Sequence, residues 1–463
     1  MSTLIEDIAR FTVNVRYADI PDQDRCSIRA LVLDTIGCAL GAVGCEPARM
    51  LQDMLRPASG PGDRATLIGS THSVSLDSAI LYNGCLVRYL DYMDVYWARD
   101  ICHPSENIPV ALAAAEAAGC DGRKLMEAIA VAYEVQIRLA DAFSLQDMCM
   151  HHVSAAGFVV PLLLGKLWDL PADKLAHACA LGGFRHLTLA ALVEGQLSMA
   201  KAVGYPLPAS ECVLATRLAA RGFTGPLLAL ESLWRASHAH HAADLREALD
   251  LAPGTGSVGR VSLKQFPVQF ALQAPIEATL TLRAEMHGDP KAVDALQVEV
   301  PERVCQSTAD PEKFRPANRE TADHSLPCCV ALAWLDGKVD AGQFDGGRWR
   351  DDDVTQLLPR VHVRAAPDLQ ARCPTGRPAR VTVRLRDGTT RTTLVETPLG
   401  DARRPMGQAD IERKFLAQAV PVLGGERADQ IVRLVRHLDD LADVGDLCRA
   451  LVPAGTPALR TDR

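Results

Sequence analysis

The spacing of apolar residues changes near residue 260, and this change constrains the fold more than any other feature of the sequence. From residue 5 to about 250, apolar residues recur three and four positions apart, as in SIRALVLDTIGCALGA and KLMEAIAVAYEVQIRLADAF. This spacing predicts helices. Several of these segments are apolar nearly all round, which is typical of helices buried within a large bundle.

After residue 260 the pattern becomes mixed. VDALQVEVP and RVTVRLRDGTTRTTLVE alternate apolar and polar residues, as half-buried strands do, and Asp387-Gly388 between two such runs predicts a hairpin. Helical segments such as PIEATLTLRAEM lie between them, and the chain turns helical again from GQADIERKFLAQAV. We therefore predict a mostly α protein. It has a large all-helical domain of residues 1–265, completed by helices within 405–463, and a smaller, lid-like α+β domain of residues 270–400.

Charge and composition exclude several classes of protein. The 463-residue chain has a net charge of -8 and no run of basic residues, which argues against nucleic-acid binding. Its first residues contain acids where a signal peptide needs a basic and then an apolar region. Since no stretch approaches the ~20 apolar residues of a membrane span, we expect no membrane partner and a cytoplasmic location.

Three features could indicate a metal or another cofactor, and each has a simpler interpretation. The 14 cysteines are scattered without a C-x-x-C pair, so we expect buried thiols and no metal cluster. The nearest group of metal-ligand types, at His238, His240 and His241, is interpreted as a solvated helix end, with metal binding as the alternative. GTGSVG at residues 254–259 fits the dinucleotide motif, but a helical segment precedes it and a strand-like one follows, which is the reverse of a dinucleotide loop. We therefore predict an interdomain linker there, and no metal or other cofactor.

The stretch RYLDYMDVYWARDICHPSEN at residues 88–107 carries the first candidate chemistry. Asp91 and Asp94 stand three positions apart, and His103 follows before a proline. The acids could cap a helix or pair with Arg88, and a residue before proline is often simply an extended loop residue. These interpretations stay open on the spacing alone.

Longer runs resemble the MmgE/PrpD family. They are NGCLVRYLDYMD followed by HPSENIPVALAAAE, then LSMAKAVG, SLKQFPVQFALQAPIEA and KFRPANRETADHSLP, in order from about residue 30 to 420. The family includes 2-methylcitrate dehydratase, cis-aconitate decarboxylase and an iminodisuccinate epimerase. The resemblance implies the helical and α+β domains described above, and a homodimer formed through the helical domain.

Within the family, three features favour the 2-methylcitrate dehydratase branch: Arg88 before the acidic motif, the spacing of eight positions from Val95 to His103, and Gln273 after the Phe-Pro pair. Two positions depart from the family pattern, since Val95 replaces a threonine and Cys328 replaces a tyrosine. The resemblance thus predicts a hydro-lyase that dehydrates a 2-methylcitrate- or citrate-like hydroxy-tricarboxylate. The alternatives are a cis-aconitate-type decarboxylase, an amino-dicarboxylate epimerase, and a binding protein without catalysis.

Dehydration without a metal cluster requires protein groups that remove a proton and assist the leaving hydroxyl, and cations that hold carboxylates. Together with the family resemblance, these chemical requirements indicate four catalytic candidates: Asp91, His103, His152 and Lys201. The expected substrate-binding residues are Arg88, Asp94, Gln273, Arg319 and His324. For Arg319, Asp323 and His324, a structural ion-pair network is the alternative to substrate contact or domain closure. We expect the small polycarboxylate to bind in a cleft between the two domains.

Overall fold

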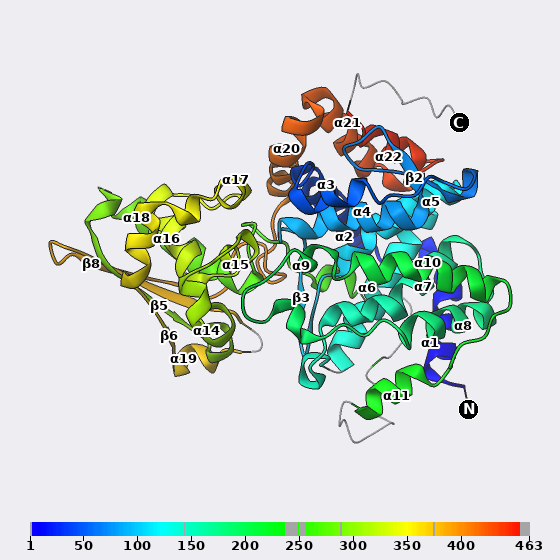
Figure 1. The fold of residues 1–463 in the computed structure, drawn as a ribbon, viewed down its shortest axis with the longest axis horizontal. Helices are drawn as coiled ribbons and strands as arrows, with labels where there is room; N and C mark the ends of the chain where they lie inside the picture. Colours follow the sequence, from blue (N-terminus) through cyan, green and yellow to red (C-terminus); the bar gives the residue numbers. More distant parts are fainter. Residues whose placement is uncertain are drawn as a thin grey trace.

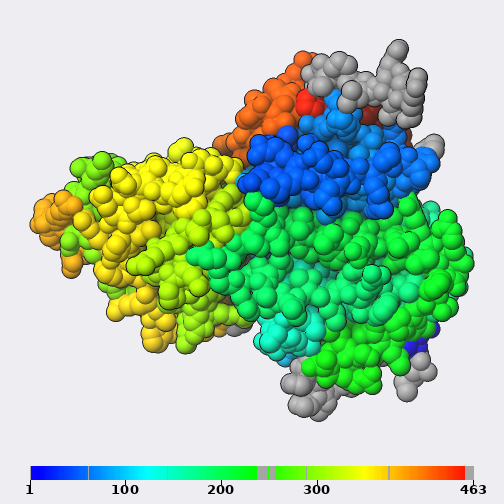
Figure 2. Space-filling view, viewed as in Figure 1, coloured from blue at the N-terminus to red at the C-terminus, as the bar shows by residue number. Residues whose placement is uncertain are grey.

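The computed structural model describes residues 2–142, 144–236, 249, 256–287, 289–373 and 376–453. In this part of the chain a large helical body adjoins a smaller α+β lobe (Figure 1). The space-filling view shows the smaller lobe, lime green through yellow to orange, against one side of the larger body (Figure 2). His238, His240, His241 and Gly254 lie outside the described residues, so the predictions for them remain predictions.

The helical body contains segments from both ends of the chain. Its helices are α1 (Leu4–Asn14), α2 (Asp22–Gly41), α3 (Glu46–Gln52), α4 (Leu76–Tyr89), α5 (Ile108–Ala118), α6 (Gly122–Ala142), α7 (Ala156–Leu167), α8 (Ala172–Gly183), α9 (Ala200–Val203), α10 (Pro206–Ala220), α11 (Ala229–Ala236), α20 (Gln408–Leu423), α21 (Gly425–Arg436) and α22 (Gly445–Ala450). Two short antiparallel pairs accompany them: β1 (Arg64–Thr66) with β2 (Ser73–Ser75), and β3 (Tyr96–Trp97) with β4 (Ile101–Cys102).

Local signals in the sequence fix the ends of several helices. The Thr3 side chain accepts a hydrogen bond from the Glu6 amide while the Glu6 carboxylate accepts one from the Thr3 amide, a capping box that begins α1. Gly119 ends α5 in the left-handed region, at φ 65°, a conformation that glycine adopts without steric cost.

The smaller lobe is a four-stranded sheet covered by helices. The strands β5 (Val293–Val300), β6 (Val361–Ala365), β7 (Ala379–Leu385) and β8 (Thr390–Val395) are ordered β6-β5-β7-β8, with β5 and β6 parallel and the other neighbours antiparallel. The Asp387-Gly388 turn joins β7 to β8, with Gly388 at φ 89°. The helices of the lobe are α13 (Gln273–Glu285), α14 (Glu302–Thr308), α15 (Arg319–Ala322), α16 (Leu326–Asp336), α17 (Ala341–Asp345), α18 (Asp352–Leu357) and α19 (Pro367–Gln370).

Each body has its own apolar core. One core takes its buried residues from positions 4–263 and again from 411–451, and the other takes them from 266–395. This architecture confirms the predicted fold class, a large helical domain with a smaller α+β domain.

Helix α20 closes the helical core from the C-terminal side. It packs on α2, and a Cβ atom at Gly37 would lie 3.2 Å from the Phe415 Cα, so the two backbones approach closely. The buried Lys414 ammonium lies 2.7 Å from the Asp34 carboxylate and donates to the carbonyls of Tyr92 and Lys264. The contacts of Lys414 with Tyr92 and Lys264 connect α20 to the segments that carry Asp91 and Lys264.

In the described part of the chain, no single helix is long and apolar enough to cross a membrane. The pair α2 and α3, bent by 83°, meets the criterion of length and composition only when both helices are taken together. In this fold α2 packs against α4 and α20.

Candidate active site

A cavity of about 150 Å³ lies between the helical domain and the α+β domain. Both domains contribute side chains to its walls: Arg88, Asp91, Trp97, Ile101, His103, Gln146, His151, His152, Val193, Leu197, Lys264, Gln269, Phe270, Arg303, Ser307, Lys313 and His324. The predicted residues Arg88, Asp91, His103, His152 and His324 are among them.

Asp91 is the centre of the charged side chains in this cavity. It follows the end of α4 with a backbone φ of 50°, a left-handed conformation that aspartate tolerates better than most residues. Its Oδ1 lies 2.7 Å from both the Arg88 guanidinium and the Lys264 ammonium. Its Oδ2 lies 3.4 Å from Lys201 Nζ and 3.3 Å from His324 Nε2. One buried carboxylate therefore faces three cations and an imidazole.

These neighbours determine which groups are charged. Burial alone would raise the pKa of Asp91, but Lys201, Lys264 and Arg88 hold it well below 3.8. Burial lowers the pKa of Lys264 to about 8, although Asp91 opposes that shift. Asp91 is thus ionised at neutral pH, whereas Lys264 is a cation that can give up its proton near neutrality.

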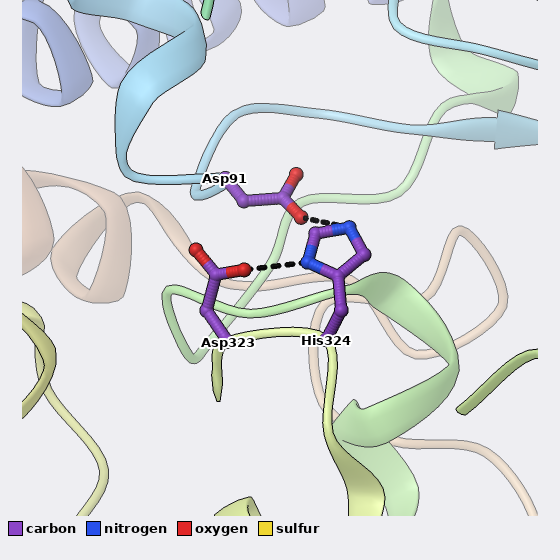
Figure 3. Close-up of side chains that lie close together, drawn as sticks. All are labelled: Asp91, Asp323 and His324. Carbon is purple, nitrogen blue, oxygen red and sulfur yellow. Dashed lines mark hydrogen bonds and ion pairs between the residues drawn. The ribbon is translucent and has the colours of Figure 1, made fainter. Parts of the chain in front are cut away.

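His324 connects Asp91 to a second carboxylate (Figure 3). Its Nδ1 lies 2.5 Å from Asp323 Oδ1 while its Nε2 faces Asp91. Asp91, Asp323 and His324 place atoms of metal-ligand type within 4.8 Å of one another. However, Lys201 lies within 3.4 Å of both carboxylates and Lys264 contacts Asp91, so a metal cation would be repelled by two ammonium groups. The arrangement suits proton sharing better than metal binding.

The histidines of the cavity are neutral, and a hydrogen bond fixes the orientation of His103. His103 Nδ1 lies 2.5 Å from the Asp94 carbonyl oxygen, and because a carbonyl only accepts, Nδ1 carries the proton and Nε2 has the free lone pair. Burial, followed by the charges of Lys264 and Arg88, lowers the pKa of His103 well below 6.5. Burial and the neighbouring His151 and His103 do the same for His152. The rings of His103 and His152 lie 5.2 Å apart.

The loop between Asp91 and His103 turns back on itself. Strands β3 and β4 pair, and this brings His103 against Asp94. The Asp94 carboxylate accepts hydrogen bonds from the Ser105 amide and hydroxyl and from the Tyr133 hydroxyl. Asp94, expected to bind substrate, is fully buried and absent from the cavity walls. Its carboxylate instead holds the loop that presents His103.

Gln273 also lies away from the cavity. Its side chain accepts from the amides of Gln265 and Phe266 and donates to the Phe266 carbonyl. It therefore fixes the backbone immediately after Lys264. Gln269, four positions earlier in the chain, lines the cavity, and its Oε1 has no hydrogen-bond partner among the described residues.

Lys201 and Arg319 lie behind the cavity walls. Lys201 extends from α9 to Asp91 and Asp323. Arg319 contacts Asp323 and Asp345, donates to the Tyr89 carbonyl and stacks 4.1 Å from the Tyr89 ring centroid. Because Tyr89 belongs to the helical domain, Arg319 joins the two domains beside the site. Val95 and Cys328 are both buried, and neither lines the cavity.

Sequence reasoning did not single out Lys264 or Glu106. The backbones of Val95 and Ser262 exchange two hydrogen bonds of 2.8 Å, and this pairing places Lys264 beside Asp91. Glu106 is buried 3.4 Å from Arg88 Nε, and burial raises its pKa to about 8 against the opposing effect of Arg88. Each residue stands within a run that the family resemblance uses, but nothing local marks it as a charged partner.

Comparison with known proteins identifies the family. The models of the MmgE/PrpD N-terminal domain and the MmgE/PrpD C-terminal domain match residues 6–245 and 266–440, so the chain belongs to the MmgE/PrpD family. It is 26% identical to cis-aconitate decarboxylase of Mus musculus over 91% of this chain and 88% of that protein. It is 24% identical to the Homo sapiens enzyme of the same name, over 100% and 97% of the two chains. With 2-methylcitrate dehydratase of Escherichia coli K12 it shares 23% identity over 86% of each chain.

Proposed function

We propose that this protein is a lyase, and specifically a metal-independent hydro-lyase that dehydrates a 2-methylcitrate- or citrate-like hydroxy-tricarboxylate. The observation that carries the proposal is the composition of the interdomain cavity, where cations for carboxylates and neutral histidines for proton transfer line the same 150 Å³. The relatives named cis-aconitate decarboxylase and 2-methylcitrate dehydratase support a lyase acting on this class of compound.

The charge of the cavity supports a polyanionic substrate. Among the described residues, its walls carry four cationic side chains, those of Arg88, Lys264, Arg303 and Lys313, and one carboxylate, that of Asp91. A surplus of positive charge in a partly desolvated cavity favours a ligand with several carboxylates.

The protonation states support an elimination. A base takes the proton next to a carboxylate, the electron pair forms the carbon–carbon double bond, and the hydroxyl leaves with a proton from an acid. His103 suits the base, because its Nε2 has a free lone pair. Lys264, with a pKa of about 8, carries a proton that it can release, and His152 lies beside His103 to share the proton transfer. Binding of a polyanion would raise the pKa of both histidines, since nearby negative charge favours their protonated forms.

Decarboxylation of a cis-aconitate-like tricarboxylate is the second candidate function. The two cis-aconitate decarboxylases resemble this chain over nearly its whole length. The same cavity would hold the three carboxylates, and one acid would protonate the carbanion left by carbon dioxide. Epimerisation of an amino-dicarboxylate needs the same proton abstraction, and a binding protein would need only the cations.

A substrate panel followed by NMR distinguishes these reactions. Purified protein is incubated with 2-methylcitrate, citrate, cis-aconitate and an amino-dicarboxylate, and His103→Ala serves as the background. We expect an alkene and water from a hydroxy-tricarboxylate. Carbon dioxide from cis-aconitate would instead establish the second candidate, and an epimer the third. Tight binding of all the tricarboxylates with no product would contradict an enzymatic role.

We further propose that the chain forms a homodimer through its helical domain. Large apolar side chains are exposed between residues 184 and 228, among them Phe184 at 53%, Leu189 at 67% and Phe223 at 59%. Phe184 and Phe223 line one surface hollow together with Leu214, and exposed apolar side chains gathered in one place are typical of an interaction surface. Light scattering is expected to give twice the monomer mass, and Phe223→Ser with Leu189→Ser should shift it to the monomer. A monomer in the unaltered protein at all concentrations would contradict the proposal.

A further inference from the structure

Arg303 differs from the other cations that line the cavity. Arg88 and Lys264 are paired with Asp91, and Lys313 lies 3.4 Å from Asp310. Among the described residues, Arg303 has no carboxylate within ion-pair distance. Its guanidinium donates to the neutral side-chain carbonyl of Gln146. Of the four lining cations in the described part of the chain, Arg303 is therefore the one without an ion pair to a carboxylate.

Arg303 lies at the solvent-facing end of the cavity, away from Asp91 and His103. It stands in the first turn of α14, in the α+β domain, and Ser307 lies one turn later on the same face, as residues four apart do in a helix. Both side chains are exposed and both line the cavity. Gln146 belongs to the facing helical domain. Arg303 thus lies where the cavity opens to solvent, whereas Asp91 and His103 are buried.

We infer that Arg303, assisted by the Ser307 hydroxyl, binds the substrate carboxylate farthest from the reacting carbon and so selects tricarboxylates over dicarboxylates. This inference rests on the proposed polycarboxylate function. A guanidinium matches a carboxylate with two parallel hydrogen bonds, a stronger pairing than its single bond to a neutral amide. The substrate therefore displaces Gln146, which holds the guanidinium in place before binding.

Binding of two unreactive probes tests the inference without requiring turnover. Tricarballylate has three carboxylates, and methylsuccinate is the same molecule without one terminal carboxylate. Calorimetry measures both with the unaltered protein, Arg303→Gln and the matched control Arg391→Gln, an exposed arginine of the same domain on β8. We expect Arg303→Gln to weaken tricarballylate about 10- to 100-fold, as loss of charged hydrogen bonds does, and to leave methylsuccinate and the control within about twofold.

The outcomes separate this inference from the proposed function. Suppose that the unaltered protein binds tricarballylate and that Arg303→Gln weakens the binding of both probes equally, or of neither. Arg303 then does not bind the third carboxylate, and only this inference fails. If the unaltered protein binds neither probe, the polycarboxylate function fails, and the inference fails with it. Arg303→Lys adds a check on geometry, since it keeps the charge and should recover only part of the preference. Circular dichroism confirms that each variant is folded.

Discussion

Replacing Asp91 with asparagine removes one negative charge from the centre of the buried cluster and leaves the shape of the side chain almost unchanged. Asparagine also tolerates the left-handed backbone at this position, where φ is 50°. Three cations, Arg88, Lys201 and Lys264, then remain together without the carboxylate that they share. The variant tests the charge separately from packing and backbone strain.

The expected cost follows from burial. Asp91 is almost completely buried, and removing one partner of a buried ion pair typically costs about 3–5 kcal/mol. Lys264 can relieve part of this repulsion by losing its proton. Its pKa of about 8 lies about one unit above neutral pH, and one unit corresponds to about 1.4 kcal/mol. We therefore expect the free energy of unfolding to fall by about 3 kcal/mol, the lower end of that range.

Urea unfolding at neutral pH, followed by circular dichroism, measures this change. Asp387→Asn is the matched control, because Asp387 lies in an exposed hairpin turn that accepts Asn-Gly equally well, so this substitution should leave the free energy of unfolding almost unchanged. A loss of less than about 1 kcal/mol in Asp91→Asn, well below the range for a broken buried pair, would refute the reasoning.

The difference in unfolding free energy between the unaltered protein and Asp91→Asn depends on pH, and this dependence gives a second check. The pKa of Asp91 is lower in the folded protein than its ordinary 3.8. Its stabilising contribution is therefore complete above that ordinary value and is lost as the pH falls through the lower, folded value. As the pH falls from neutral, Lys264 of the variant regains the proton whose loss relieved the repulsion, so the stability difference between the two proteins should widen. It should shrink only in stronger acid, as Asp91 of the unaltered protein becomes protonated.

Four further substitutions test individual roles. His103→Ala and His152→Ala should each lower kcat about 100-fold in steady-state assays on the substrate that the panel identifies, as loss of an acid or base does; near-full activity in both folded variants would place the reaction elsewhere. Lys201→Ala should lower kcat more than it raises KM, because Lys201 lies behind the cavity walls and contacts Asp91 and Asp323; a rise in KM with kcat unchanged would mean instead that Lys201 binds the substrate directly. Glu106→Gln should flatten the pH dependence of unfolding, because the wild-type pKa is raised from 4.5 to about 8 and stability is lost as the pH rises between those values; equal slopes in denaturation series across that range would contradict it.

The fold was predictable because its main signals are local. Helical periodicity, strand alternation and the Asp387-Gly388 turn each lie within a short segment, and the structure has α-helices, strands and a hairpin at those places. The order of the sheet was not predicted, because the parallel pairing of β5 with β6 joins segments about 65 residues apart through backbone atoms. Apolar alternation reports which face of a strand is buried, not which strand lies beside it.

The site was predictable only in part for a related reason. Residue type and family resemblance indicated Asp91 and His103, which the structure places in one cavity. Lys264 was not predicted as a site residue, because its partner Asp91 stands 173 positions earlier in the chain. Asp94 and Gln273 were expected at the substrate because a polar side chain that serves a nearby backbone has the same sequence signature as one that contacts a ligand. Only the hydrogen-bond partners distinguish the two roles.

Because α20 packs into the helical domain, the two domains can complete their folding in a fixed order while the protein is being synthesised. The α+β core lies within one continuous stretch, so all its parts are available while the remainder of the chain is still being made. The helical core is completed later, because Asp34 and Gly37 on α2 contact Lys414 and Phe415 only after α20 has emerged from the ribosome. Lys414 also anchors the carbonyls of Tyr92 and Lys264. The domain that comes second in the sequence can therefore fold first, and the segments around Asp91 are fixed only after α20 has left the ribosome.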